Sequence, residues 1–271
     1  MTRQTPARPT AERVSDESHA VDRSVTQRTV NGLTFRAVSS HRRAPNALAF
    51  VLVHGLGTSH KYFTRLHREL SAHGDVHSID LPGFGGLPKP AGAPDVAEIS
   101  NALATVLEDL GVSGGILVGH SMGAQWAVEL ALQHPERASA VVVCGPVTDR
   151  RHRSLSAQML LLVTDFLREP LALNVMVFRD YLRCGPLWYA TQVRHMLRYR
   201  LDERVALLRM PLLIVRGSAD VIAGQRWCTQ LKESAPSADV VVIPRHRHLA
   251  QFTAAADVAR RIHEFVRRIP A

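Results

Sequence analysis

The chain has 271 residues, of which 46% are hydrophobic and 21% charged, and this composition excludes a disordered chain and a collagen-like fibre. Its formal charge is +9, with 33 Lys and Arg residues against 24 Asp and Glu residues, but the basic residues are spread out and not interleaved with aromatic residues. We therefore expect no nucleic-acid partner. The apolar runs fall far short of the roughly 20 residues of a membrane helix, so we expect no membrane insertion.

The N-terminal segment is polar. Residues 1–23 are rich in Thr, Arg, Ser, Asp and Glu, and we expect them to form a flexible tail. The first 28 residues lack the apolar core of a secretory signal, which favours a cytoplasmic protein. Two alternating segments follow within residues 24–38. Asn31 and Gly32 between them predict a β-hairpin, because both residues tolerate positive φ.

Short apolar runs then alternate with segments of helical periodicity. We predict strands at residues 48–53, 76–80, 116–119, 140–144, 212–216 and 240–243. We predict helices at residues 62–72, 96–110, 122–133, 224–232 and 254–268. This alternation predicts an α/β fold with a mostly parallel central sheet flanked by helices on both faces.

Residues 150–209 interrupt the alternation. They contain no clear strand and three helical stretches, at residues 156–168, 171–183 and 189–199. Because this region lies between two predicted strands, we interpret it as an inserted helical cap. Residues 24–149 and 210–271 would then form the core.

The cysteines indicate neither a disulfide framework nor a zinc site. Cys144, Cys184 and Cys228 are odd in number and widely spaced, which predicts buried free thiols. His246 and His248 form a His-x-His pair, but no carboxylate or third histidine lies at ligand spacing. We therefore expect no metal and no cofactor.

The most informative stretch contains Ser121. It is the centre of a Gly-x-Ser-x-Gly motif, Gly119-His120-Ser121-Met122-Gly123, which joins a predicted strand to a predicted helix. So sharp a turn forces the serine into a strained backbone conformation, and the two glycines relieve the crowding around it. The motif predicts a nucleophilic serine above the sheet, at the positive end of the following helix.

From about Thr29 to its C-terminus, the chain resembles the α/β-hydrolase fold family. The resemblance implies a helical cap inserted after the sixth strand and a nucleophilic serine served by an acid and a histidine. It rests on the serine motif, on a late acid and histidine, and on two loops that follow successive strands, His54-Gly55-Leu56-Gly57 and Asp80-Leu81-Pro82-Gly83-Phe84-Gly85.

A serine hydroxyl needs a base to take its proton and a third group to orient that base. In this family the order along the chain is serine, acid, histidine. The resemblance implies Asp220 as the acid, with Asp149, after the preceding strand, as the alternative. It implies His248 as the base, counted from Pro244, with His246 as the alternative.

The resemblance also implies an oxyanion hole made of two backbone N–H groups. In relatives, one belongs to the residue after the nucleophile and the other to the residue after His-Gly, which here are Met122 and Leu56. His54 is a candidate substrate contact, and the alternative is that it braces this loop.

Further substrate contacts are expected near this loop and in the cap. Tyr62 and Phe63 either line the acyl pocket or anchor the first helix, and Trp188 lies in the predicted cap. Arginines of the cap could recognise a carboxylate or phosphate, although a solvated helical face is the alternative. They are Arg150, Arg151, Arg179, Arg183, Arg194 and Arg198.

These features predict a serine hydrolase that cleaves a carboxylic ester or related acyl bond of a small molecule through an acyl-enzyme. Three alternatives stay open: a C–C bond hydrolase of ring-cleavage products, a cofactor-free perhydrolase, and a non-catalytic ligand-binding protein on the same fold. Epoxide hydrolases and haloalkane dehalogenases are disfavoured, because their nucleophile is an aspartate. The sequence indicates no oligomeric state.

Overall fold

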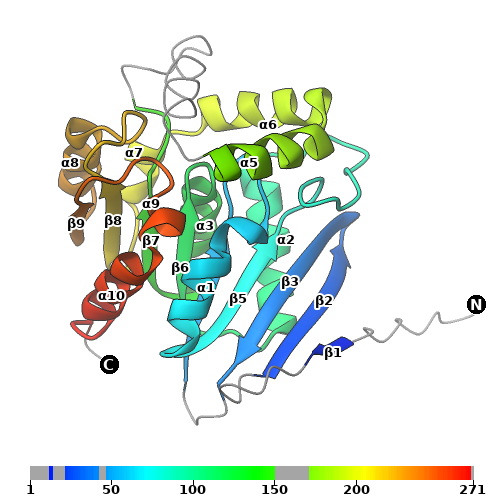
Figure 1. The fold of residues 1–271 in the computed structure, drawn as a ribbon, viewed down its shortest axis with the longest axis horizontal. Helices are drawn as coiled ribbons and strands as arrows, with labels where there is room; N and C mark the ends of the chain where they lie inside the picture. The colour runs from blue at the N-terminus through cyan, green and yellow to red at the C-terminus, as the bar shows by residue number, and fades with distance from the viewer. Residues whose placement is uncertain (1–11, 15–21, 43–46, 150–170, 270–271) are drawn as a thin grey trace, which may run out of the picture.

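A computed structural model describes residues 12–14, 22–42, 47–149 and 171–269 of the chain. Within these ranges nine strands form one sheet in the order β1-β2-β3-β5-β4-β6-β7-β8-β9 (Figure 1). The strands are β1 (Glu12–Val14), β2 (Asp22–Val30), β3 (Leu33–His41), β4 (Leu48–Val53), β5 (Gly74–Asp80), β6 (Gly115–His120), β7 (Ala138–Cys144), β8 (Leu212–Gly217) and β9 (Ala238–Ile243). From β5 to β9 every neighbouring pair is parallel, whereas the pairs from β1 to β3, and β3 with β5, are antiparallel.

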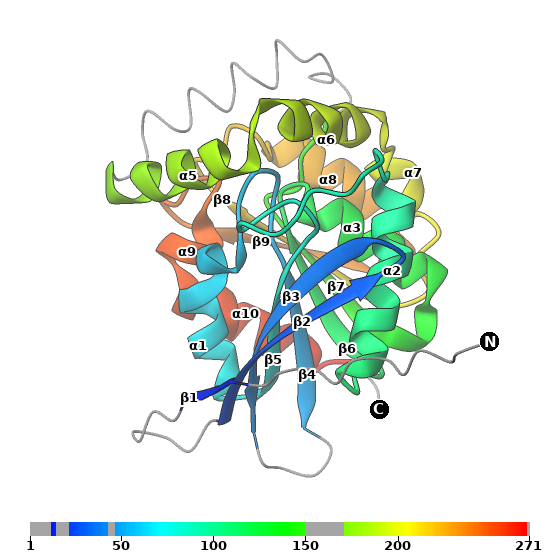
Figure 2. The same cartoon turned by 90° about the vertical axis from the view of Figure 1, so that its right-hand side faces the viewer.

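Helices cover both faces of the sheet. They are η1 (His60–Phe63), α1 (Thr64–Ser71), α2 (Val96–Asp109), α3 (Gly123–Gln133), η2 (Pro135–Arg137), α5 (Leu171–Cys184), α6 (Pro186–Arg198), α7 (Leu201–Val205), α8 (Gln225–Ser234), α9 (Ala250–Thr253) and α10 (Ala255–Val266). Helices α2, α3, α7 and α8 pack on one face, around Trp126 and Trp227. Helices α1 and α10 pack on the other, around Phe50 and Phe265 (Figures 1 and 2). Because β4 and β6 to β8 are buried on both faces, they read as continuous apolar runs.

The predicted hairpin is confirmed. Asn31 and Gly32 have φ of 51° and 78°, and β2 pairs with β3 in a register that sets Val30 opposite Leu33. These are the positive φ angles that a two-residue hairpin turn requires. Strand β1 falls within residues 1–23 and pairs with β2, which itself begins at Asp22. The rest of that segment lies outside the described residues.

Helices α5 and α6 lie across the carboxyl end of the sheet (Figure 2). They follow β7, which is the sixth strand once the short β1 is left out, and they correspond to the helices predicted at 171–183 and 189–199. The helix predicted at 156–168 lies outside the described residues. Among the described helices, none has the length and apolar character needed to cross a membrane.

Candidate active site

Ser121 occupies a strained turn between β6 and α3. Its φ is 57°, in the left-handed region that non-glycine residues rarely adopt. A side chain at Gly119 would collide with the Gly123 carbonyl oxygen, and one at Gly123 would collide with the Val53 carbonyl oxygen. The Ser121 N–H donates to the Cys144 oxygen at 2.9 Å, which ties the turn to the end of β7. The turn therefore tolerates only glycine on either side of the serine.

His248 and Asp220 form a buried hydrogen-bonded pair. His248 Nδ1 lies 3.1 Å from Asp220 Oδ2. The other carboxylate oxygen, Oδ1, accepts from the N–H groups of Ile222 and Ala223 at 2.8 and 2.9 Å. Because a carboxylate only accepts, the hydrogen of the imidazole belongs on Nδ1, and Nε2 carries the lone pair that a general base needs.

The pair stabilises the ionised form of Asp220. Burial alone would raise the pKa of this carboxyl group, but the charge and hydrogen bond of His248 and the two backbone amides hold that pKa below its usual range. The carboxylate therefore stays charged and keeps the imidazole in one orientation.

Two contacts bring the pair to the serine turn, and a third brings the loop after β4 to that turn. His120, which precedes Ser121, lies with Nε2 3.1 Å from the His248 carbonyl oxygen, and the two imidazole rings are 4.8 Å apart. A Cβ added at Gly145, just after β7, would lie 3.0 Å from the His248 ring. A Cβ added at Gly55 would lie 3.0 Å from Ser121 Cβ. The strand ends of β4, β6 and β7 thus converge on Ser121 and His248.

The two histidines of the His-x-His pair point to different partners. His246 Nδ1 lies 2.9 Å from Thr253 Oγ1 on α9, and the His246 carbonyl oxygen accepts from Ala219 N–H at 2.9 Å. His248 instead contacts Asp220. The alternative acid, Asp149, lies five residues beyond β7, in the electrostatic surroundings of Cys228. This geometry favours Asp220 and His248.

The loop of residues 54–59 is called the oxyanion loop below, because it contains Leu56, whose N–H is predicted to be an oxyanion donor. This loop is held from beneath by His54. Leu81 N–H donates to His54 Nε2 at 3.1 Å, and His54 Nδ1 lies 2.7 Å from the Gly55 oxygen. Burial lowers the pKa of His54, which keeps the ring neutral and able to accept. With both ring nitrogens engaged by the backbone, His54 has the geometry of a brace. Thr58 adds a hydroxyl bond to the Gly55 oxygen at 3.0 Å.

Leu56 and Met122 both lie buried beside the serine turn. Leu56 sits in the oxyanion loop between Gly55 and Gly57, and Met122 is the N-cap residue of α3. An N-cap position places backbone N–H groups at the positive end of the helix dipole.

The neighbours Tyr62 and Phe63 point to different parts of the molecule. Tyr62 packs with Val177 of α5 and with Leu249, the residue after His248. Phe63 packs on the far face, in the same cluster as Phe50. Tyr62 therefore lies between α5 and the residue after His248, whereas Phe63 has the position of an anchor for α1.

Helices α5 and α6 rest on two glycines of the loops below. The ring of Tyr181 occupies the space that a side chain at Gly57 would take, and the ring of Trp188 occupies that space at Gly83. The rings of Trp188 and Phe84 lie 6.1 Å apart. Trp188 is buried, so the structure sets this predicted contact residue at the boundary between α6 and the core.

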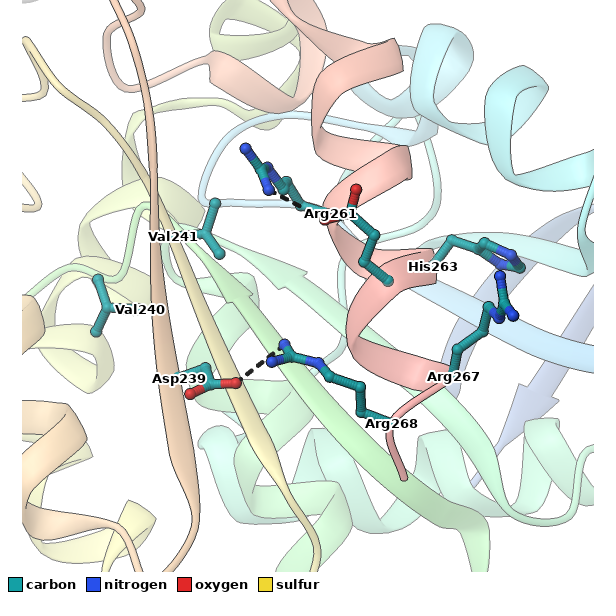
Figure 3. Close-up of a pocket in the computed structure, with 8 residues that line it drawn as sticks. Asp239, Val240, Val241, Arg261, His263, Arg267 and Arg268 are labelled. Atoms are coloured by element: carbon teal, nitrogen blue, oxygen red, sulfur yellow. Dashed lines mark hydrogen bonds and ion pairs between the residues drawn. The ribbon is translucent and has the colours of Figure 1, made fainter. Parts of the chain in front are cut away.

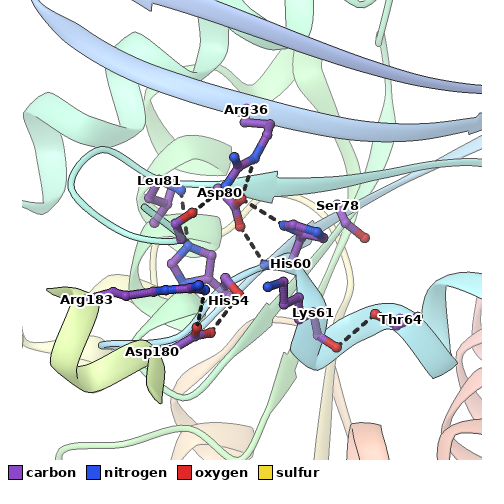
Figure 4. Close-up of polar contacts among 12 residues, drawn as sticks. Arg36, His54, His60, Lys61, Thr64, Ser78, Asp80, Leu81, Asp180 and Arg183 are labelled. Carbon is purple, nitrogen blue, oxygen red and sulfur yellow. Dashed lines mark hydrogen bonds and ion pairs between the residues drawn. The ribbon is translucent and has the colours of Figure 1, made fainter. Parts of the chain in front are cut away.

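A second polar cluster lies behind the oxyanion loop (Figure 4). Asp80, at the end of β5, accepts from Arg36 Nε at 2.8 Å and from His60 N–H at 2.6 Å, and its Oδ2 lies 2.8 Å from His60 Nδ1. Burial would raise the pKa of Asp80, but its hydrogen bond with His60 and the charges of His60 and Arg36 lower that pKa to about 2. The cluster joins β3, β5 and η1.

The surface also carries a groove of about 680 Å³ between the edge strand β9 and α10 (Figure 3). Its basic side chains meet acidic ones: Arg268 pairs with Asp239 and Arg261 with Glu264, each at 3.0 Å. None of the predicted site residues lines it. Among the described residues, no three His, Cys, Asp or Glu side chains are grouped as metal ligands.

The cysteine prediction is confirmed. Cys144, Cys184 and Cys228 are free thiols and all three are buried. The predicted cap arginines Arg150 and Arg151 lie outside the described residues.

A sequence profile described as the alpha/beta hydrolase family matches residues 50–261, which is most of the chain. The chain belongs to the alpha/beta hydrolase family. Solved structures that resemble this family member include an enol-lactonase from Burkholderia xenovorans LB400, with a TM-score of 0.77, 19% identity, and coverage of 89% of this chain and 100% of that one. An esterase from Thermogutta terrifontis gives a TM-score of 0.73 at 19% identity, with 98% of this chain and 100% of that one covered. These likenesses confirm the predicted α/β-hydrolase fold.

Relatives that are similar in sequence include two bacterial proteins. A 2-hydroxy-6-oxononadienedioate/2-hydroxy-6-oxononatrienedioate hydrolase of Burkholderia vietnamiensis is 27% identical over 252 residues, covering 81% of this chain and 87% of the relative. The dihydrolipoyllysine-residue acetyltransferase component of the acetoin cleaving system of Pseudomonas putida is 27% identical over 241 residues. That match covers 80% of this chain and 63% of the relative, so the chain spans less than two thirds of that protein.

The sequence predicts no role for several residues that shape the site. His120 contacts His248 and Gly145 gives it room, and both stand at strand ends, where the sequence offered a positional signal. Ser59 and Asp180 are hydrogen-bonded although 121 positions separate them in the chain, and no local sequence pattern predicts that contact.

Proposed function

We propose that this family member is a serine hydrolase that cleaves a carboxylic ester or related acyl bond of a small molecule. The observation that carries the proposal is the buried Asp220–His248 pair beside Ser121 in its strained turn. A serine nucleophile requires this set of groups: a base, and a carboxylate that orients the base. The enol-lactonase and the esterase that share the fold act on bonds of this class by their names.

In the proposed mechanism Ser121 Oγ attacks the carbonyl carbon while His248 Nε2 takes its proton. The Asp220 carboxylate stabilises the imidazolium, and the backbone N–H groups of Leu56 and Met122 donate to the developing oxyanion. His248 then returns the proton to the leaving alkoxide, and the acyl-enzyme forms. Water attacks that ester with His248 as base, and the acid and Ser121 are released.

We further propose that residues 150–209 form a cap over this site and residues 24–149 and 210–271 the core. Helices α5 and α6 support this division, because Tyr181 and Trp188 pack directly on the loops after β4 and β5. Tyr62 on the core side and Trp188 on the cap side are the proposed substrate contacts. A small-molecule acyl substrate would lie between them.

The test is hydrolysis of p-nitrophenyl esters of graded chain length by the wild type and by Ser121→Ala. We expect turnover in the wild type and a loss of roughly 10³-fold or more in the variant, because the nucleophile is gone. His246→Ala serves as a matched control with an intact nucleophile. Equal ester turnover by Ser121→Ala and wild type would contradict the proposal.

A C–C bond hydrolase is the second candidate. The relative from Burkholderia vietnamiensis favours it, since its name gives a ring-cleavage type of substrate and it aligns over most of both chains. The same variant pair, assayed on a 2-hydroxy-6-oxo-dienoate, separates the two functions. Serine-dependent turnover of the dienoate with no turnover of esters would replace the first proposal by the second.

A further inference from the structure

Asp180 is a buried carboxylate on a helix whose neighbouring residues face solvent. It is 4% exposed, whereas Phe178 and Leu182 on the same helix, α5, are 57% and 68% exposed. Ionised side chains are rarely buried without partners, because they lose their hydration. The burial of Asp180 therefore calls for specific contacts.

Two groups supply them. Ser59 Oγ donates to Asp180 Oδ2 at 2.7 Å, and both side chains are buried. On the other side Arg183 Nη1 lies 3.8 Å from Asp180 Oδ1 (Figure 4). A hydrogen bond to a charged acceptor is stronger than one between neutral groups, and burial strengthens it further. Of these contacts, the one to Ser59 joins α5 to the core.

Ser59 is the last residue of the oxyanion loop. Its carbonyl oxygen accepts from Tyr62 N–H at 3.0 Å, and it directly precedes η1. The first residue of the loop, His54, is fixed by its bonds to Leu81 and Gly55. The loop that carries Leu56 is thus held at one end by the core and at the other by α5.

We propose that Asp180 is a positioning residue, which latches α5 onto the oxyanion loop through Ser59 and so fixes the backbone of the loop that contains Leu56, the proposed oxyanion donor. The catalytic half of this inference rests on the proposed function. Through this hydrogen bond, the position of α5 and the geometry of the oxyanion loop depend on each other. Removal of the Asp180 or the Ser59 side chain should therefore release both α5 and the oxyanion loop.

The docking of α5 has a readout that needs no turnover. Cys184, the last residue of α5, is 1% exposed, and burial raises the pKa of its thiol to about 11. Cys144 in β7 and Cys228 in α8 are equally buried and report on the core. Alkylation of the three thiols by iodoacetamide, followed by peptide mass spectrometry, therefore separates release of α5 from general unfolding.

We expect Asp180→Ala and Ser59→Ala each to speed alkylation of Cys184 by about 10-fold, with the rates at Cys144 and Cys228 unchanged. Asp180→Asn keeps an acceptor oxygen, so its effect should be smaller. Thr191→Ala is the matched control, because it removes an exposed hydroxyl bond within α6. Unchanged Cys184 rates in both alanine variants would overturn the latch.

The second readout is the rate at which a fluorophosphonate probe phosphonylates Ser121. We expect Asp180→Ala and Ser59→Ala to slow phosphonylation by the same factor as each other. The double variant should react no more slowly than either single variant, because the two side chains act as one unit. Release of Cys184 with undiminished phosphonylation would overturn the positioning role. A wild type that does not react and hydrolyses no ester would refute the proposed function, while the Cys184 rates would still decide the latch.

Discussion

At the scale of single residues, the two histidines of the His-x-His pair are a natural comparison. They are two positions apart, yet His248 meets a carboxylate and His246 meets the hydroxyl of Thr253. Only the first contact fixes a tautomer with a basic Nε2. A two-residue spacing along an irregular loop is enough to separate the two environments.

We expect His248→Ala to lower kcat for ester hydrolysis by roughly 10³-fold or more, since the base is removed. His246→Ala should keep kcat within about threefold and lose at most about 1 kcal/mol of stability, the value of one ordinary hydrogen bond. Kinetics with p-nitrophenyl butyrate and urea unfolding of both variants provide the measurement. A larger loss of kcat in His246→Ala than in His248→Ala would reverse the assignment of the base.

At the scale of elements, the sequence alone is enough to predict the strands and the turn that contains Ser121. The run at 48–53 coincides with β4, and the other predicted strands differ from the observed ones by at most two residues at an end. Apolar runs buried on both faces and glycine-flanked turns are local signals. Local signals predict Ser121 as the nucleophile, and the order along the chain predicts Asp220 and His248 as its partners once the family is recognised.

Helix α5 shows why the rest was not predictable. Val175, Phe178 and Leu182 share one face at helical spacing, and periodicity alone would bury them. The structure exposes all three and buries Asp180 instead. The reason is that the core side of α5 meets the polar Ser59 of the oxyanion loop. Which polar residue faces inward depends on a partner 121 residues away, and no window of sequence contains both.

The packing of α5 and α6 on two loop glycines leads to a prediction at the scale of elements. Gly57, Gly83 and Gly86 have similar positive φ, of 74°, 79° and 84°, so alanine should strain each backbone by about 1 kcal/mol. Only at Gly57 and Gly83 would the new methyl group meet a ring, from Tyr181 and Trp188 respectively. We expect these two variants to lower kcat/KM for esters by about 10-fold, and Gly86→Ala to leave it nearly unchanged.

The measurement is kcat/KM across the ester series, together with the melting temperature of each variant. Gly86→Ala is the internal control, since a Cβ there meets nothing within 4 Å. If Gly86→Ala lowered kcat/KM as much as the other two, backbone strain rather than ring contact would be the cause.

At the scale of the whole molecule, the Asp80 cluster couples the antiparallel hairpin to the parallel sheet. Arg36 reaches Asp80 from β3, and His60 reaches it from η1. The ordinary pKa of this carboxyl group is 3.8 in the unfolded chain, and in the folded protein it falls to about 2. A depressed pKa contributes stability above the unfolded value, and that stability is lost as the pH falls toward the folded value.

We therefore expect Asp80→Asn to lower the free energy of unfolding by roughly 2 kcal/mol at pH 7, and the difference from wild type to shrink between about pH 4 and pH 2. Asp109→Asn is the control, because it removes the same charge from a half-exposed ion pair with Arg28 at 2.7 Å. That loss should stay below about 1 kcal/mol. Urea unfolding at pH 7, 5 and 3 measures both. Equal losses in the two variants at pH 7 would refute the role of the cluster.

The chain leaves the sheet after β7 and returns to it at β8, and these two strands are direct neighbours. The two ends of the segment between β7 and β8 therefore lie side by side. Closing this segment costs little more entropy when it is long than when it is short. Asp220 and His248 both follow the point of return. This segment can consequently be lengthened, shortened or exchanged during evolution while Asp220 and His248 keep their places in the fold. We expect substrate range to diversify through this segment faster than the reaction itself.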